Sequence, residues 1–229
     1  STSESGSLRE NHNLTFTAPH PFPPDVYSIS VVYESDPEAQ CLTTVSIPAS
    51  MEDTNLNIPE TLQHWIDSRL ANPLLKLDVS SLCWGINRYW EAALSRAQIW
   101  TKLERKHSDL VAGSASSNRK RDDRQWDSRA LTRSDLGHLI SHLERSAMVF
   151  ESTDRTAKAL LSCTLTIDEW TSEPHLTPEI SVLTAPPNRR IEDESKKLFM
   201  ALLGENKPRS GSDENGVVRA AEGVLASLF

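Results

Sequence analysis

The sequence predicts an α+β protein in which an antiparallel sheet packs against several helices, one of them long. Apolar and polar residues alternate in the N-terminal third (14–47) and again between 159 and 184, and apolar residues follow helical spacing from about 80 to 111. We expect the N-terminal strands and the later hairpin to share one sheet. We also expect residues 13–229 to form a single composite domain, with division into two lobes at the linker near 112–130 as the alternative.

Three strands are predicted in the N-terminal third, after a disordered polar leader over residues 1–12. Leu14 and Phe16 alternate with polar neighbours, and the runs 26–33 and 41–47 are typical of strands. Because short turns join these segments, an antiparallel meander is expected.

Two helices should follow. Asn57-Ile58-Pro59-Glu60 has the residues of a helix start, and Asn72-Pro73 ends that helix. The second helix, about 80–111, is the strongest helical signal in the chain. Its apolar stripe consists of Leu82, Ile86, Tyr89, Ala93, Ala97 and Trp100.

The second half of the chain contains further predicted elements. Flexible insertions are expected at about 112–130 and 204–216, and Thr132 with Asp135 should begin a helix that ends near Phe150. A strand over 159–170 and a second strand containing Ile180 and Val182 should form a hairpin with a long loop. Helices are expected over 191–203 and 217–229.

Composition excludes several classes of protein. The net charge of −8 opposes general binding to nucleic acid. No apolar run approaches the roughly 20 residues of a membrane span, so no membrane association is expected. Cys41, Cys83 and Cys163 are odd in number and widely spaced, which favours an intracellular, reducing compartment.

The familiar catalytic and cofactor motifs are missing. There is no G-x-S-x-G, no phosphate-binding P-loop and no G-x-G-x-x-G, so we assign no catalytic residue, no cofactor and no metal ligand. Asp135, His138 and His142 share one face of a predicted helix, but no fourth metal ligand is visible. An enzyme whose site assembles in the fold from dispersed His and Asp residues, such as His20 with these three, remains an alternative.

The tryptophans are the most informative residues. Six is a large number for this length, and three of them fall in the predicted long helix, where they cannot all share one face. The candidate partner-binding residues are therefore Trp84, Trp90, Leu94 and Trp100. A wide core between two layers would explain the same pattern, and both interpretations stay open.

One basic run, consisting of Arg119, Lys120, Arg121 and Arg124, interrupts the acidic sequence. It is compatible with a nuclear-import signal or a local phosphate contact, and equally with a solvated linker, since Asp122 and Asp123 fall within it. This run suggests a nuclear setting, with the cytoplasm as the alternative.

The run Pro21-Phe22-Pro23-Pro24-Asp25-Val26-Tyr27, followed by a strand, resembles the proline-rich stretch of RWD and ubiquitin-conjugating-like folds. The resemblance covers about a dozen residues. The leading helix of those folds is missing, and no His-Pro-Asn precedes a candidate catalytic cysteine. The resemblance implies a non-catalytic interaction module.

These observations together predict a non-enzymatic protein-binding subunit or adaptor of a larger intracellular complex. Its partner is expected to be another protein chain, in a hetero-complex rather than a homo-oligomer. A nucleic-acid-associated adaptor that uses the run 119–124 is a further alternative.

Overall fold

The structure is a computed structural model that describes residues 9–23, 27–48, 58–112, 133–204 and 214–229. The chain forms two compact units. Unit 1 takes its residues from Ser1–Glu91 and Thr166–Pro174, and unit 2 from Ala92–Leu165 and His175–Phe229. The chain passes from unit 1 to unit 2 between Glu91 and Ala92, within one long helix, returns to unit 1 for Thr166–Pro174, and enters unit 2 again at His175.

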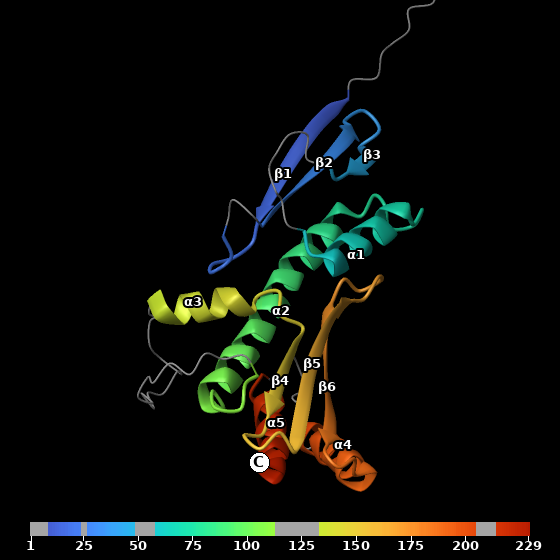
Figure 1. The fold of residues 1–229 in the computed structure, drawn as a ribbon. Coiled ribbons are helices and arrows are strands. Elements are labelled where there is room, and N and C mark those ends of the chain that lie inside the picture. The colour runs from blue at the N-terminus through green and yellow to red at the C-terminus, as the bar shows by residue number, and fades with distance from the viewer. Residues whose placement is uncertain (1–8, 24–26, 49–57, 113–132, 205–213) are drawn as a thin grey trace, which may run out of the picture. The chain divides into compact units, whose positions relative to one another are not determined.

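Unit 1 contains the predicted N-terminal meander. Its strands are β1 (Glu10–Thr17), β2 (Ser28–Asp36) and β3 (Cys41–Ser46), paired antiparallel in the order β1-β2-β3 (Figure 1). Because β1 begins at Glu10, the last residues of the expected leader belong to the sheet. The register places apolar side chains opposite one another, Leu14 against Val31 and Phe16 against Ile29.

Aromatic side chains form part of the core of unit 1. Besides the sheet, this unit holds α1 (Glu60–Ala71) and the first part of α2 (Val79–Lys106). Trp90 of α2 makes edge-to-face contacts with Phe22, Tyr27 and Tyr89, at ring-centroid distances of 5.1, 5.7 and 5.4 Å. Four aromatic rings thus pack together in the unit.

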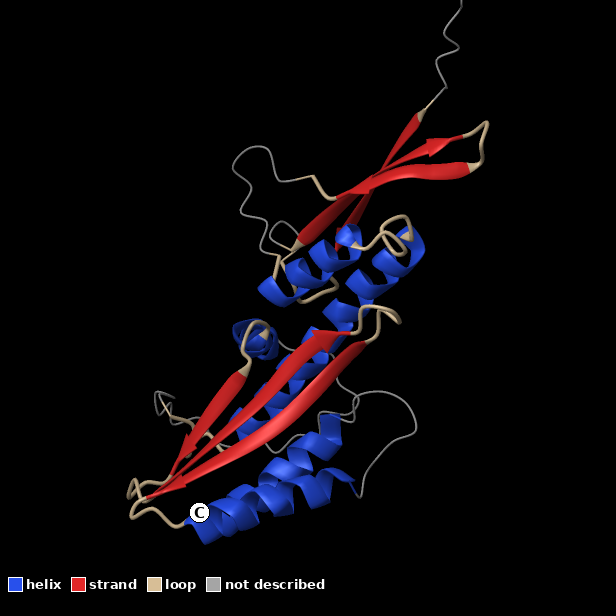
Figure 2. Ribbon diagram, turned by 90° about the vertical axis from the view of Figure 1, so that its right-hand side faces the viewer, coloured by secondary structure: helices blue, strands red, loops and turns tan. Residues whose placement is uncertain are grey.

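Unit 2 is a second three-stranded sheet with helices on one face. The antiparallel strands β4 (Ala147–Glu151), β5 (Ala157–Ile167) and β6 (Pro174–Thr184) lie in that order (Figure 2). The helices α4 (Arg189–Gly204) and α5 (Glu214–Leu228) pack with the end of α2. The shared core includes Trp100, Leu103, Phe150, Leu161, Cys163, Ile180, Phe199 and Val224.

The α+β class is confirmed, but the strands form two sheets and not the single sheet expected. Alternation along a strand fixes which face is buried, and it carries no information about which strands pair. In the N-terminal meander, β2 pairs with β1 on one edge and with β3 on the other. The later hairpin finds its third strand in β4, a segment that the sequence did not identify.

That segment corrects a second expectation. The helix predicted to reach Phe150 is α3 (Arg133–His142), and β4 follows it. Met148 and Phe150 are buried and alternate with the exposed Val149, which is the period of a strand. Over five residues this alternation is too short to be distinguished from helical spacing, and pairing with β5 decides the outcome.

The hairpin loop and the end of the long helix also differ from expectation. β6 begins at Pro174, so a short turn replaces the long loop predicted between the strands. α2 ends at Lys106 and not near residue 111, because the next residues cover the free edge of β4. The Ala112 N–H donates to Val149 O at 3.0 Å, and the Glu151 N–H donates to Leu110 O at 2.7 Å.

Several predicted segments lie mainly outside the described residues. The two insertions at 112–130 and 204–216 and the basic run fall almost wholly outside the described residues, although α5 already begins at Glu214. The single composite domain stays a prediction. None of the described helices combines the length and hydropathy needed to cross a bilayer.

A glycine fixes the packing of α1 on α2. A Cβ atom at Gly85 would lie 2.3 Å from Cη2 of Trp65, a ring that cannot bend away. We expect Gly85→Ala to lower the free energy of unfolding by about 1–3 kcal/mol, despite the better helix propensity of alanine. Urea denaturation of the two proteins measures the difference.

Gly137→Ala is the matched control, since a Cβ there meets nothing within 4 Å on α3. This exposed helical substitution should be neutral or should stabilise by up to about 1 kcal/mol. Equal effects of the two substitutions would contradict the proposed packing of Trp65 on Gly85.

Candidate protein-interaction site

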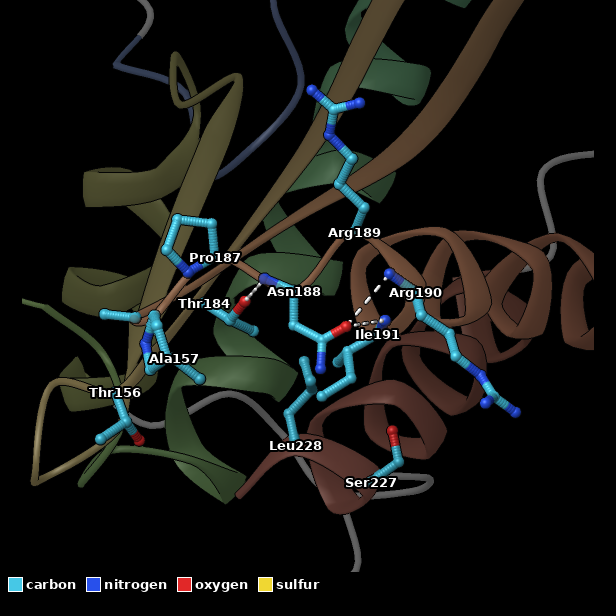
Figure 3. A pocket seen from close by; sticks show the side chains of 12 residues that line it. Thr156, Ala157, Thr184, Pro187, Asn188, Arg189, Arg190, Ile191, Ser227 and Leu228 are labelled. Atoms are coloured by element: carbon cyan, nitrogen blue, oxygen red, sulfur yellow. Dashed lines mark hydrogen bonds between the residues drawn. The ribbon is translucent and has the colours of Figure 1, made fainter.

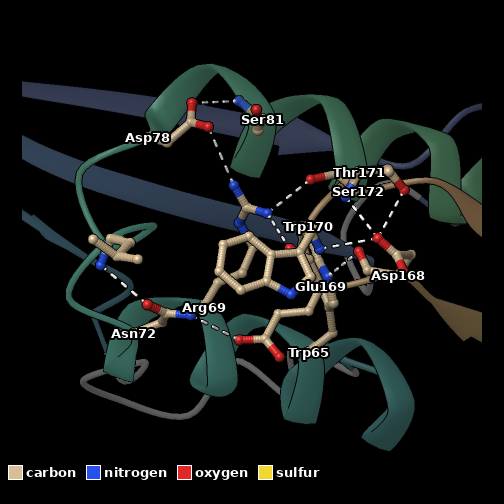
Figure 4. A network of polar contacts seen from close by, with 11 residues as sticks. Trp65, Arg69, Asn72, Asp78, Ser81, Asp168, Glu169, Trp170, Thr171 and Ser172 are labelled. Atoms are coloured by element: carbon tan, nitrogen blue, oxygen red, sulfur yellow. Dashed lines mark hydrogen bonds and ion pairs between the residues drawn. The ribbon is translucent and has the colours of Figure 1, made fainter.

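The turn between β5 and β6 is held by a buried arginine. Arg69 of α1 is 1 % exposed, and its Nη1 donates to Glu169 O at 2.6 Å and to Ser172 Oγ at 2.9 Å (Figure 4). Its Nη2 lies 3.4 Å from Oδ2 of Asp78, just before α2. A guanidinium is costly to bury, and these bonds to backbone, hydroxyl and carboxylate offset that cost.

The turn is also braced from within and from α1. Asp168 Oδ1 accepts the N–H groups of Trp170 and Thr171 at 3.0 and 2.7 Å. Trp65 Nε1 donates to Asp168 O at 3.2 Å. Ser172 is buried with a φ of 60°, an unfavourable conformation for a side chain with a Cβ. The hydrogen bond from Arg69 to its hydroxyl helps to hold the turn in this conformation.

This braced turn exposes a tryptophan. Trp170 is 63 % exposed at the end of the hairpin, beside the residues that fix its backbone (Figure 4). Unit 1 exposes further large apolar side chains on and before α2. Together with Trp170 we call them the tip surface: Leu74, Leu77, Trp84 and Trp170.

Arg88 connects Trp84 to the hairpin. Its guanidinium carbon lies 5.6 Å from the Trp84 ring centroid, and its Nε lies 3.7 Å from Oε2 of Glu173. Glu173 belongs to the same turn as Trp170, so this ion pair joins the Trp84 region of α2 to the turn. Stacking on Arg88 also restricts the Trp84 side chain.

The four predicted partner-binding residues have different environments. Trp84 is half exposed and Leu94 is half-buried, whereas Trp90 and Trp100 are buried in the cores of unit 1 and unit 2. Trp100 Nε1 donates to Arg145 O at 2.7 Å, so its polar atom is satisfied inside the unit. The interpretation of a wide core therefore describes Trp90 and Trp100, and Trp84 alone of the three indoles is available to a partner.

Trp170, Leu74 and Leu77 of the tip surface were not among the predicted partner-binding residues. Trp170 stands in the run Asp168-Glu169-Trp170-Thr171-Ser172-Glu173, and acidic and hydroxyl residues on both sides of an aromatic residue are typical of a turn. A tryptophan in a turn is usually near the surface, so this signal was available.

The predicted histidine cluster forms in part. His142 is 1 % exposed, and its Nε2 lies 2.7 Å from Oε2 of Glu104 on α2, while Nδ1 of His138 lies 3.8 Å from the same oxygen. The Asp135 side chain lies outside the described residues, and His20 belongs to unit 1. Among the described side chains no group of three or more His, Cys, Asp or Glu is arranged to hold a metal.

Burial decides the protonation of His142. Desolvation lowers the pKa of His142 below its usual value, and the hydrogen bond to Glu104 opposes this only in part. At neutral pH the neutral ring donates from Nε2 to the carboxylate. Nδ1 is buried without a hydrogen-bond partner in the described structure, so a second proton there would be unsatisfied.

The cysteines show no sign of activation. Burial raises the pKa of Cys163 to about 11. Burial likewise raises the pKa of Cys83, and Cys41 is exposed. Because the thiolate is the nucleophilic form, Cys83 and Cys163 are poor nucleophiles at neutral pH.

A shallow cavity of about 660 Å³ lies at the start of α4 in unit 2 (Figure 3). Polar side chains in this cavity form hydrogen bonds with backbone N–H groups at the N-terminus of α4. Asn188 Oδ1 accepts the Arg190 N–H at 3.2 Å, and Thr184 Oγ1 accepts the Asn188 N–H at 2.7 Å. Arg190 pairs with Glu194 at 2.8 Å. The described residues that line the cavity include no Asp, Glu, His or Cys.

No model of a known protein family matches the chain, and no curated protein matches its sequence. The resemblance of residues 21–27 to RWD-like folds therefore rests on that short stretch alone. The basic residues Arg119, Lys120, Arg121 and Arg124 lie outside the described residues. The tip surface is thus the candidate site with the strongest support from geometry.

The role of Arg69 is tested by Arg69→Met, which keeps most of the side-chain volume. The acceptors Glu169 O and Ser172 Oγ would lose their charged donor, and we expect the free energy of unfolding to fall by about 2–4 kcal/mol. Asp78→Asn is the control: Asp78 is more exposed, and the cost should stay below about 1 kcal/mol. Similar losses in the two variants, measured by urea denaturation, would contradict the central role of Arg69.

The burial of neutral His142 predicts a pH dependence. The unfolded chain takes up a proton on His142 first as the pH falls, so stability should be complete above the ordinary histidine pKa of 6.5 and be lost as the pH falls toward the lowered folded pKa. His142→Gln should reduce this loss between pH 7.5 and 5.5, as measured by urea denaturation. His138→Gln, at an exposed position, should change it much less, since desolvation is the main cause of the lowered pKa of His142. An unaltered pH dependence in His142→Gln would refute the assignment.

Proposed function

We propose that this protein is a non-enzymatic binding subunit or adaptor that contacts another protein chain through the tip surface. The observation that carries the proposal is the exposure of Trp170 on a turn that a buried arginine holds in place. Single exposed apolar residues are common, but this unit exposes two tryptophans, and the arginine that stacks on Trp84 is ion-paired to the turn that carries Trp170.

The physical advantage of this arrangement is preorganisation. A partner that covers Trp170 gains the burial of a large indole, which is a frequent anchor of protein interfaces. The backbone of the turn is already fixed by Arg69 and Asp168, so little conformational entropy is lost when the partner binds. Trp84 is similarly restricted by Arg88.

Charge favours a different chain as the partner over a second copy. The turn carries Asp168, Glu169 and Glu173 and no basic residue. In a two-fold symmetric contact the same surface faces itself, so these carboxylates would lie near their counterparts and repel. This supports a hetero-complex. The nuclear setting is a further proposal that depends on the basic run 119–124.

The proposal is tested with tagged full-length chains carrying Trp170→Ala or Trp84→Ala. We expect each substitution to reduce recovery of a stoichiometric partner from the native cells by at least about fivefold, since losing an interfacial indole costs more than 1 kcal/mol. Mass spectrometry gives the stoichiometry, and the melting temperature should change little.

Leu183→Ala is the control, because Leu183 is 65 % exposed but lies on β6 in unit 2. It should leave partner recovery intact. Recovery of the wild-type chain without a partner, or equal recovery from all variants, would overturn the proposal.

A further inference from the structure

The turn that carries Trp170 has acidic residues and no basic residue. Glu169 accepts a hydrogen bond from the neutral amide of Asn72 at 3.1 Å, a contact that does not neutralise its carboxylate. Glu173 and Glu91 share one cation, Arg88. Arg69 is buried beneath the turn and is paired with Asp78.

Unit 1 already places guanidinium groups on tryptophan rings. Arg69 lies 5.4 Å from the ring centroid of Trp65, and Arg88 lies 5.6 Å from that of Trp84. Within the part of the chain that the structure describes, no cation lies over the ring of Trp170. Trp170 is therefore an exposed indole on a turn that also carries Glu169 and Glu173, and both an aromatic ring and a carboxylate attract a cation.

We propose that the tip surface binds a lysine- or arginine-containing segment of the partner protein. This inference rests on the proposed function and specifies the partner's chemistry. One cationic side chain of the segment lies over Trp170, and Glu169 and Glu173 compensate its charge. The alkyl stem of the same side chain covers part of the exposed indole, because long basic side chains combine an apolar stem with a charged end.

Other partner chemistries fit less well. An acidic segment or a nucleic acid would meet the carboxylates of the turn with like charge. A purely apolar segment would remove Glu169 and Glu173 from water without giving them a cation, and that desolvation is unfavourable. Only a basic segment satisfies both the indole and the carboxylates.

The probe is a fluorescein-labelled peptide of alternating lysine and glycine, compared with an aspartate–glycine peptide and a leucine–serine peptide of equal length. Fluorescence anisotropy with the full-length wild-type chain measures binding. We expect the lysine peptide alone to bind, and its affinity to fall steeply as the salt concentration rises.

Variants localise the binding. Trp170→Ala should weaken it by about fivefold or more, the effect of losing one cation–π contact. Glu169→Gln with Glu173→Gln should weaken it similarly while keeping side-chain size. Glu179→Gln on β6 removes an exposed charge from unit 2 and should have little effect.

The outcomes separate this inference from the proposed function. If the lysine peptide does not bind, if the peptides bind equally, or if Glu179→Gln weakens binding as much as the variants of the turn, the basic-segment proposal is wrong. If partner recovery nevertheless depends on Trp170, protein binding at this surface stands and the bound segment is not a basic one. If the lysine peptide does not bind and partner recovery does not depend on Trp170, both proposals are wrong.

Discussion

The buried guanidinium of Arg69 is the interaction on which the rest of the candidate site depends. It reaches the backbone of the turn at Glu169, the hydroxyl of Ser172 and the carboxylate of Asp78 at once. Arginine suits this role because its planar group has donors in several fixed directions and remains charged. Together with the hydrogen bonds of Asp168, these bonds hold the backbone of the turn that exposes Trp170.

The three tryptophans of the long helix α2 lie in three different environments. Successive residues of an α-helix are rotated by about 100°, so Trp84 and Trp90 point in directions about 120° apart. Trp90 joins the aromatic core of unit 1, while Trp84 faces solvent and stacks with Arg88. Farther along, Trp100 belongs to the core of unit 2. Two of the three tryptophans of α2 are therefore core residues, because this helix contributes to the core of each unit.

Local patterns predicted most elements because each depends on neighbours in sequence. The three N-terminal strands, α1 with its end at Asn72, and most of α2 follow from periodicity and from proline positions. β4 was missed because five residues carry too little periodicity, and its strand identity comes from pairing with β5. The short turn before Pro174 was missed for a related reason: besides the local bonds of Asp168, it is held by Arg69, about a hundred residues away in sequence.

By itself, therefore, the sequence determined the α+β class, the acidic character and the lack of familiar catalytic motifs. The net charge is a sum over residues, and the fold class and motifs follow from local sequence patterns, so none of them depends on contacts between distant segments. Only the tertiary structure decided that the strands form two sheets, that Trp90 and Trp100 are core residues, and that Trp170 is exposed on a braced turn. Burial of a side chain is set by segments distant in sequence, and no local pattern records which segments those are.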